Sequence, residues 1–212
     1  MEYPNLFHLG FREINLSDRF FDSLKEDYED FENWYGKKQA NHEDAYVQYD
    51  KDNNLQGFLY IKMEEEKIVK DVIPNIEAER IMKVGTFKID AHGTRMGEQF
   101  LKVLFDYAID NNADVCYVTI FEKYRGLIEL ISRYGFKEWG IKEKGGKTEK
   151  VFLRNMRLIV GDIFEDYPLV TCRGSHKYLL SVYPKYHSKL FPESILTNES
   201  RNIIKDIGVK SK

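Results

Sequence analysis

A turn that contains two glycines lies between an expected strand and an expected helix, and it is the part of the chain best suited to bind an anion. Gly93 and Gly97 stand in this turn, and glycine lets a backbone approach a ligand closely. The first amides of a helix lack partners inside the helix and lie beside the positive end of its dipole, so a phosphate or pyrophosphate binds well there. Glycine before a helix is more often ordinary turn chemistry, so the pattern indicates an anion site only in the right structural context.

The elements on both sides of this turn are predicted from hydrophobic spacing. Residues 81–87 have the pattern of a strand with an interior glycine, Gly85. Residues 99–108 carry apolar side chains at the spacing of one helix face. The order is therefore strand, glycine turn and helix, which places the first amides of the helix at the turn.

A second strand and helix come next in the chain. Residues 115–121 are almost continuous in β-branched and aromatic residues, as expected of a strand covered on both faces. Within it, Cys116 is expected to be a small buried hydrophobe. The next helix opens at 123–126 and ends at Gly135, which suits a left-handed C-cap position.

The N-terminal part predicts a strand and an aromatic-rich helical region. Residues 7–14 alternate large apolar residues with others, as in a half-buried strand. Ser17 is the expected N-cap of the helical region. Aromatic and apolar residues at spacings of three and four over 20–35 predict one helix or two joined helices that pack on the core. The alternative, that one face of this region lines a substrate cleft, stays open.

Two hairpins and an exposed edge complete the expected elements. Residues 45–61 form a hairpin around the polar turn 50–54, and residues 136–153 form another around Gly145 and Gly146. Residues 64–66 are three successive glutamates, which predict a solvated edge and no metal site, because successive strand residues cannot all face one point. The predicted order is β, α(α), β, β, β, α, β, α, β, β.

Composition narrows the class of protein. The 212 residues are 42% hydrophobic and 14% aromatic, so a core is expected and disorder of the whole chain is not. The net charge of −3 gives no basic field for a dedicated nucleic-acid binder. Two cysteines form neither a disulfide framework nor a metal cluster. With no signal peptide and no membrane-spanning run recognised, a soluble cytoplasmic protein is expected.

The chain is expected to divide into a main domain, residues 1–155, and a C-terminal extension, residues 156–212. The extension is too small to hold an independent core comfortably, and its end is polar and rich in lysine. Either it packs on the main domain or the chain is the front part of a longer protein.

The element order, the strand–turn–helix around Gly97 and the sequence Arg133-Tyr134-Gly135-Phe136 together resemble the GNAT superfamily of N-acetyltransferases over about residues 7–155. The resemblance implies an α/β (α+β) fold, with a mixed, mostly antiparallel sheet, a splayed central pair of parallel strands and flanking helices. It also implies acetyl-CoA as cosubstrate, bound in the V-shaped opening of that strand pair, and a primary amine as acceptor.

The family holds the pyrophosphate of the cofactor with a turn motif, Q/R-x-x-G-x-G/A. The turn of this chain matches that motif only in part. Gly97 takes the last position and His92 the first, while Arg95 stands where the central glycine is normal. A guanidinium could still donate to a phosphate; the alternative is an exposed arginine at a helix start. Backbone amides over 94–98 would hold the pyrophosphate, and 87–89 would hydrogen-bond the pantetheine arm as an added strand does. The predicted cofactor-binding residues are Phe87, Lys88, Ile89, His92, Gly93, Thr94, Arg95, Met96, Gly97 and Glu98.

The proton-transfer residues of the family carry over poorly. Where family members often have a tyrosine as general acid, this chain has Ile131, so Tyr124, at the start of the same helix, is the candidate substitute. The carboxylate that some members carry in the strand before the glycine turn, here residues 81–87, maps near Lys83. No general base can be named, and Glu77, Glu79 and a chain of waters are all open.

The extension resembles, more faintly, the connector of longer GNAT-like proteins that continue into an ASCH/PUA-like domain associated with RNA. The matching residues lie at 183–187 and 190–194. RNA is therefore an expected partner only if the extension belongs to a longer protein. The residues support two hypotheses: an acetyl-CoA-dependent N-acetyltransferase, or a degenerate GNAT module that binds coenzyme A or serves in interactions. The sequence predicts neither the acceptor nor the oligomeric state.

Overall fold

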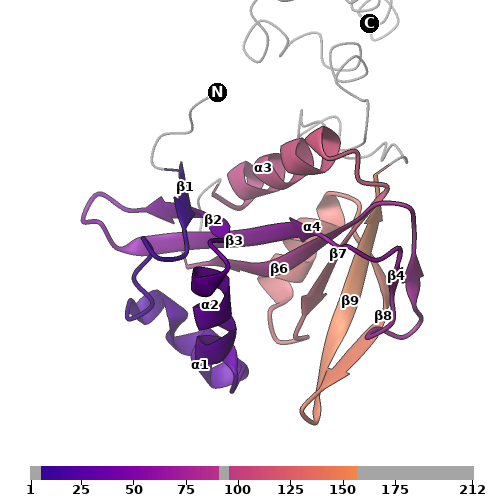
Figure 1. The fold of residues 1–212 in the computed structure, drawn as a ribbon, viewed down its shortest axis with the longest axis horizontal. Helices are drawn as coiled ribbons and strands as arrows, with labels where there is room; N and C mark the ends of the chain where they lie inside the picture. Colours follow the sequence, from indigo (N-terminus) through magenta and orange to yellow (C-terminus); the bar gives the residue numbers. More distant parts are fainter. Residues whose placement is uncertain (1–5, 91–95, 157–212) are drawn as a thin grey trace, which may run out of the picture. The chain divides into compact units, whose positions relative to one another are not determined.

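The computed structural model describes residues 6–90 and 96–156, and its elements follow the predicted order with two added strands (Figure 1). The strands are β1 Leu6–Gly10, β2 Asp44–Tyr49, β3 Leu55–Met63, β4 Ile68–Val69, β5 Ile76–Glu77, β6 Ile81–Ile89, β7 Val115–Ile120, β8 Lys137–Lys144 and β9 Lys147–Asn155. The helices are the 3-10 helix η1 Arg19–Phe21, followed by α1 Asp22–Asp27, α2 Phe31–Ala40, α3 Met96–Asp110 and α4 Arg125–Arg133. The small strands β4 and β5 were not predicted.

Seven strands form one sheet in the order β1-β2-β3-β6-β7-β9-β8, and β4 and β5 form a second, two-stranded sheet. The β6–β7 pair is parallel, whereas β1–β2, β2–β3, β7–β9 and β8–β9 are antiparallel. The predicted class, a mixed and mostly antiparallel sheet with one parallel pair and flanking helices, is confirmed.

By its internal contacts the described part of the chain divides into two compact units, which separate residues up to 62 and from 83 to 101 from residues 63–82 and those from 102 onward. The expected C-terminal extension, from Met156 onward, lies outside the described residues except for Met156 itself. Its boundary and its resemblance to a connector therefore stay predictions.

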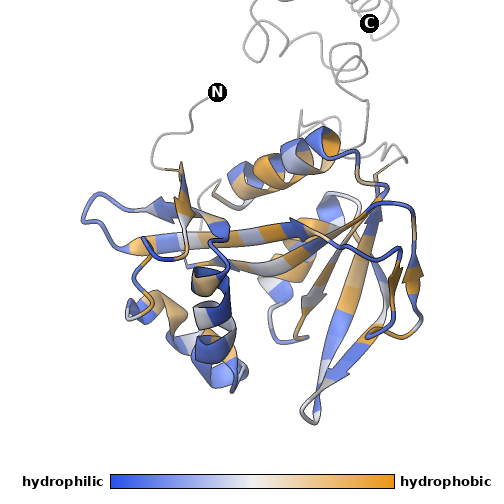
Figure 2. Ribbon diagram, viewed as in Figure 1, coloured by the Kyte–Doolittle hydropathy of each residue, from blue (hydrophilic) through white to orange (hydrophobic). Residues whose placement is uncertain are grey.

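An aromatic cluster forms the core of the first unit. Phe21, Phe31 and Tyr35 come from the helical region, and Phe11 and Phe58 meet them edge-on. The Tyr35 hydroxyl is satisfied in this core, because it lies 3.1 Å from the carbonyl oxygens of Phe11 and Ile14. The predicted aromatic stripe is therefore core packing, on two joined helices. In Figure 2 most of α2 is hydrophilic, whereas β3 is mostly hydrophobic.

The start of this helical region differs from the prediction. Asp18, and not Ser17, caps η1, because the Asp18 carboxylate accepts a hydrogen bond of 2.8 Å from the Phe20 amide. Ser17 instead donates its amide to the Asn15 side chain. The first strand also ends early, at Gly10, where the Glu13 carboxylate accepts from the Gly10 amide and a turn begins.

Successive residues of β3 face opposite sides, and this alternation decides what each face packs against. Phe58 and Tyr60 belong to the aromatic cluster under the helices. Gly57 faces the first turns of α3, where a Cβ would lie 2.8 Å from Phe100 Cζ and 3.0 Å from Met96 Sδ. A glycine at position 57 therefore lets α3 begin close to the sheet.

In the second unit, the predicted turns adopt the expected backbone. Gly135 has φ +84° at the end of α4, and Gly145 and Gly146 have φ +58° and +75° in the β8–β9 hairpin. Cys116 is fully buried, as predicted. Beside these, the buried Arg154 guanidinium donates to the carbonyl oxygens of Tyr134 (3.0 Å) and Asn155 (2.6 Å).

The unpredicted strands β4 and β5 pack on the same unit. Val69, Val72 and Ile76 form an apolar cluster with Tyr117 of β7 and Val151 of β9. The residues after Val72 reach β8, where the backbone of Ile73 exchanges two hydrogen bonds, 2.8 and 2.9 Å, with Ile141.

One glutamate of the run 64–66 does not lie on a solvated edge. The Tyr117 hydroxyl donates to the Glu64 carboxylate at 2.6 Å. Burial raises the pKa of Tyr117, and the hydrogen bond to Glu64 raises it further. The prediction of a solvated edge was wrong for Glu64, whereas Glu65 and Glu66 are exposed.

Candidate functional site

An irregular step in β6, residues 85–87, lies near the end of that strand. A Cβ on Gly85 would point at the Tyr60 ring, 2.5 Å from Cδ1, on the side of the sheet where α2 packs. Phe87, two residues later, instead packs on Phe100 of α3, with ring centroids 6.0 Å apart. Residues two apart in a regular strand share a face, so the alternation is broken between Gly85 and Phe87.

The next residue confirms the change of face. The Lys88 ammonium lies 4.4 Å from the centre of the Phe20 ring and donates to the Phe20 carbonyl oxygen, on the side of the aromatic cluster. In a regular strand Lys88 and Gly85 would face opposite sides, yet both face the cluster. One extra residue in a strand produces this effect, as a β-bulge does, and such irregularities interrupt strand pairing and redirect side chains beside functional sites.

The Lys88 side chain, which belongs to a predicted cofactor-binding residue, is held by contacts within the protein. Its ammonium is held by the Phe20 carbonyl and lies 3.3 Å from the Asp90 carboxylate. The charge of Lys88 is therefore directed into the protein, and the binding of the pantetheine arm by the backbone of 87–89 stays a prediction. Phe87 is buried and Ile89 is half-buried.

The first turn of α3 contributes Met96, Gly97 and Glu98. Met96 and Gly97 are buried, and Glu98 is partly exposed. A helix of this length has unsatisfied amides at its start and a positive dipole end, which suit an anion. Glu98 adds a carboxylate to that turn, so a bound phosphate would be held by the amides and not by this side chain. His92, Gly93, Thr94 and Arg95 lie outside the described residues.

The predicted proton-transfer residues belong to the second unit. Tyr124 precedes the first residue of α4 and is half-buried, with the Lys123 ammonium 5.1 Å from the centre of its ring. Ile131 is fully buried in the core, which fits an apolar residue and provides no proton donor. Of the carboxylates left open as bases, Glu79 forms an exposed ion pair with Lys67 and Glu77 is exposed on β5.

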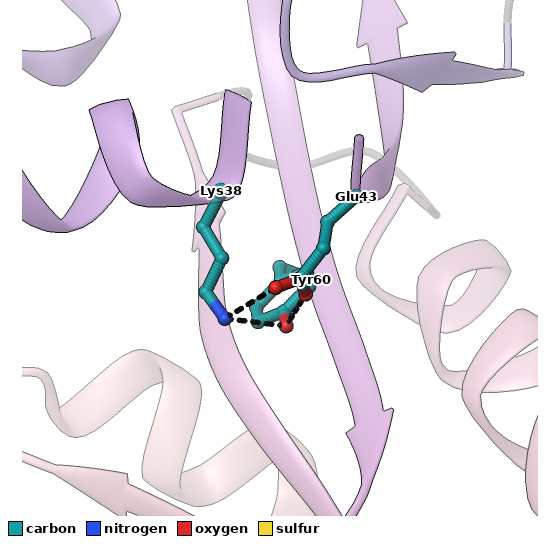
Figure 3. A network of polar contacts seen from close by, with 3 residues as sticks. All are labelled: Lys38, Glu43 and Tyr60. Atoms are coloured by element: carbon teal, nitrogen blue, oxygen red, sulfur yellow. Dashed lines mark hydrogen bonds and ion pairs between the residues drawn. The ribbon is translucent and has the colours of Figure 1, made fainter. Parts of the chain in front are cut away.

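A polar network in the first unit was missed by sequence reasoning (Figure 3). It joins Lys38 of α2, Glu43 just before β2, and Tyr60 of β3. The Lys38 ammonium donates to the Glu43 carboxylate and to the Tyr60 hydroxyl, both at 2.9 Å, and the Tyr60 hydroxyl donates to the other Glu43 oxygen. Burial raises the pKa of Glu43, but the hydrogen bonds from Tyr60 and Lys38 outweigh it and lower that pKa overall. Only the spacing of five residues between Lys38 and Glu43 hinted at this network in the sequence.

No helix in the described ranges is long and apolar enough to cross a membrane. No protein-family model matches the sequence, and no curated protein matches it.

Solved structures do resemble the chain. Naa20 of Chaetomium thermophilum, solved with a bisubstrate analogue, is 13% identical, with a TM-score of 0.52 over 80% of this chain and 94% of its own. NAA60 of Arabidopsis thaliana, also solved with a bisubstrate analogue, is 13% identical, with a TM-score of 0.48 over 71% of this chain and 97% of its own. Both are GNAT N-acetyltransferases. The likeness to Naa20, over nearly its whole length, agrees with the strand order and the parallel β6–β7 pair: the chain has the GNAT fold.

Proposed function

We propose that the protein is an acetyl-CoA-dependent N-acetyltransferase that transfers an acetyl group to a primary amine. The observation that carries this proposal is the irregular step of β6 followed by the start of α3, within a GNAT fold. An interrupted strand leaves backbone groups for a ligand, and a helix start offers amides to an anion.

The described residues fit coenzyme A through their backbone. The amides of Met96, Gly97 and Glu98 suit the diphosphate, with Gly97 allowing close approach. Backbone groups of 87–89 suit an extended arm that adds to the strand. The Lys88 ammonium contacts Phe20 and Asp90, which supports a role for the backbone of this residue and not for its charge.

Acetyl-CoA, when bound, supplies an acetyl thioester that is activated toward an amine. The protein would contribute mainly orientation, because holding two reactants in reactive geometry supplies much of the rate of such a transfer. Backbone amides directed at the developing oxyanion would add electrostatic stabilisation. Tyr124 is the candidate donor of a proton to the departing thiolate.

A second function is favoured by one observation. The position where the family often has its acid is the buried side chain of Ile131. A GNAT module that binds coenzyme A without catalysis, or that serves in interactions, would need no residue there.

Thermal unfolding with and without acetyl-CoA is the first test, because ligand binding to the native state raises the midpoint. Release of coenzyme A thiol across a panel of amines is the second. A raised midpoint with amine-dependent thiol release supports the enzyme, and a raised midpoint alone supports the binding module. An unchanged midpoint at millimolar ligand would reject both cofactor-dependent roles.

Matched glycine variants locate the site. Gly97→Trp should abolish the ligand-induced rise, and Gly97→Ala should weaken it; because Gly97 is buried, far-UV circular dichroism is used to select variants that keep the native fold. Gly36→Trp is the control, because a Cβ at Gly36 on α2 meets no atom within 4 Å. Full ligand response in Gly97→Trp would show that the site lies elsewhere.

A further inference from the structure

We propose that Lys38, Glu43 and Tyr60 form a positioning network that fixes the irregular step of β6, with Tyr60 as the residue through which it acts. This inference rests on the proposed function, because the network is proposed to hold β6 in the geometry that acetyl transfer needs. Tyr60 would be a positioning residue and not a catalytic one.

The network is closed, since each of its three members bonds to the other two. Its members come from α2, the α2–β2 connection and β3 (Figure 3). The Lys38 ammonium also lies over the rings of Tyr60, at 4.8 Å, and Trp34, at 5.9 Å. Partly buried, charge-assisted hydrogen bonds of this kind reinforce one another and hold one arrangement. The position of the Tyr60 ring is therefore fixed from its hydroxyl end.

The other end of the Tyr60 side chain lies against β6. The atoms of its ring occupy the space that a Cβ on residue 85 would need, with Cδ1 at 2.5 Å and Cε1 at 2.8 Å from that point. Tyr60 is 3% exposed, so its ring is packed inside the protein against this strand. The glycine and the tyrosine are complementary in shape, and the ring determines where the backbone of Gly85 can lie.

The strand is held on the far side of the step as well. Phe87 packs on Phe100, and Lys88 is held by Phe20. The change of face thus lies between the contact of Gly85 with Tyr60 and the contacts of Phe87 and Lys88. Releasing the Tyr60 contact should let the step relax toward regular alternation without unfolding the unit, because the contacts after it remain.

Hydrogen–deuterium exchange of the amides of residues 84–88, followed by mass spectrometry, tests the network directly. Tyr60→Phe removes the shared hydroxyl and Lys38→Met removes the cation. Each should accelerate exchange of these amides about tenfold, the size expected for the loss of a charge-assisted hydrogen bond that limits local opening. Lys38→Arg, which keeps the charge, should restore most of the protection. Lys37→Met, at the neighbouring exposed position, is the control and should change nothing.

Kinetics of the same variants distinguish a role in positioning the strand for catalysis from a role in stability alone. Tyr60→Phe should lower kcat about tenfold and weaken the Kd for coenzyme A by less than that, since the strand that holds the pantetheine arm relaxes but the amides at the start of α3 are not touched. Unchanged exchange at 84–88 in Tyr60→Phe would overturn the proposal, and so would an equal acceleration across the whole unit. If the wild type transfers no acetyl group, the proposed function fails, and the exchange measurement still decides the network by itself.

Discussion

Phe100 of α3 lies directly against the backbone of Gly57 in β3, so close that a Cβ at position 57 would lie only 2.8 Å from the Phe100 Cζ atom. Phe100 is fully buried, so its ring cannot move into solvent. Gly57→Ala should therefore lower the free energy of unfolding by about 1–3 kcal/mol, the usual cost of overpacking a core. Urea denaturation measures this change.

Two variants make the Gly57 result specific. Gly57→Ala combined with Phe100→Leu should recover part of the loss, because the smaller side chain leaves space for the methyl group. Gly36→Ala should stabilise the protein slightly, since alanine is the better helix former and nothing lies within 4 Å. A Gly57→Ala variant as stable as the wild type would mean that α3 does not sit this close to β3.

Arg154 links the end of α4 to β9. Its buried guanidinium donates to the carbonyl oxygens of Tyr134 and Asn155, and cations are favoured near the C-terminus of a helix. Arg154→Met keeps most of the side-chain volume but removes these donors, and should cost about 2–4 kcal/mol of unfolding free energy. Lys137→Met, at an exposed position of β8, is the control. An equal effect of both substitutions would contradict the stabilising role of the Arg154 hydrogen bonds.

The stability supplied by Glu43 should depend on pH. Hydrogen bonds from Tyr60 and Lys38 overcome the effect of burial and bring the Glu43 pKa below its ordinary value of 4.5. A lowered pKa means that the carboxylate stabilises the fold fully above pH 4.5 and that this contribution is lost as pH falls through the lowered value. Wild type should exceed Glu43→Gln in unfolding free energy at neutral pH, and the gap should close in acid. A gap that stays constant into acid would disprove this linkage.

The thiol of Cys116 should be unreactive in the native protein. It is fully buried, and burial raises its pKa, so little thiolate forms and reagent has no access. In a Cys172→Ser background, Ellman's reagent should label Cys116 only after denaturant is added. Rapid labelling of the native protein would show that β7 opens far more often than its packing suggests.

Replacement of the candidate acid has a kinetic signature. Tyr124→Phe should reduce kcat about 10²-fold at neutral pH if the phenol protonates the leaving thiolate, and should leave the Kd for coenzyme A unchanged. The effect should shrink with an acetyl thioester whose leaving thiol is more acidic, since that thiolate needs less help. Full activity in Tyr124→Phe would remove this residue from the reaction.

Local signals in the sequence were sufficient for most of the fold. The polar turn at 50–54 separates β2 and β3, and the backbones of Gly135, Gly145 and Gly146 are left-handed as their positions required. These features depend on a few neighbouring residues, which is why they could be predicted. The strands β4 and β5 could not, because strands of two residues have no period to detect, and Val69 and Ile76 acquire their role only against Tyr117.

The candidate site was predictable only in outline. The glycine turn indicated a helix start, and α3 begins at Met96. The irregular step of β6 was invisible, because it depends on the contact of Gly85 with Tyr60, a residue far along the chain. The Lys38 network escaped notice for the same reason, since its three members come from separate segments. Tertiary contacts of this kind leave no periodic trace in a sequence.

The pairing of Ile73 with Ile141 has a consequence for the behaviour of concentrated samples. Strand β8 is last in the sheet order, and an open outer strand invites pairing with another molecule. Here the backbone of Ile73 already pairs with part of the open edge of β8. Gly140 lets this segment come so close that a Cβ at position 140 would lie 2.7 Å from Pro74 Cδ. A Gly140→Val substitution would push this protecting segment away, and the first symptom should be slow fibril growth on storage rather than loss of the folded state.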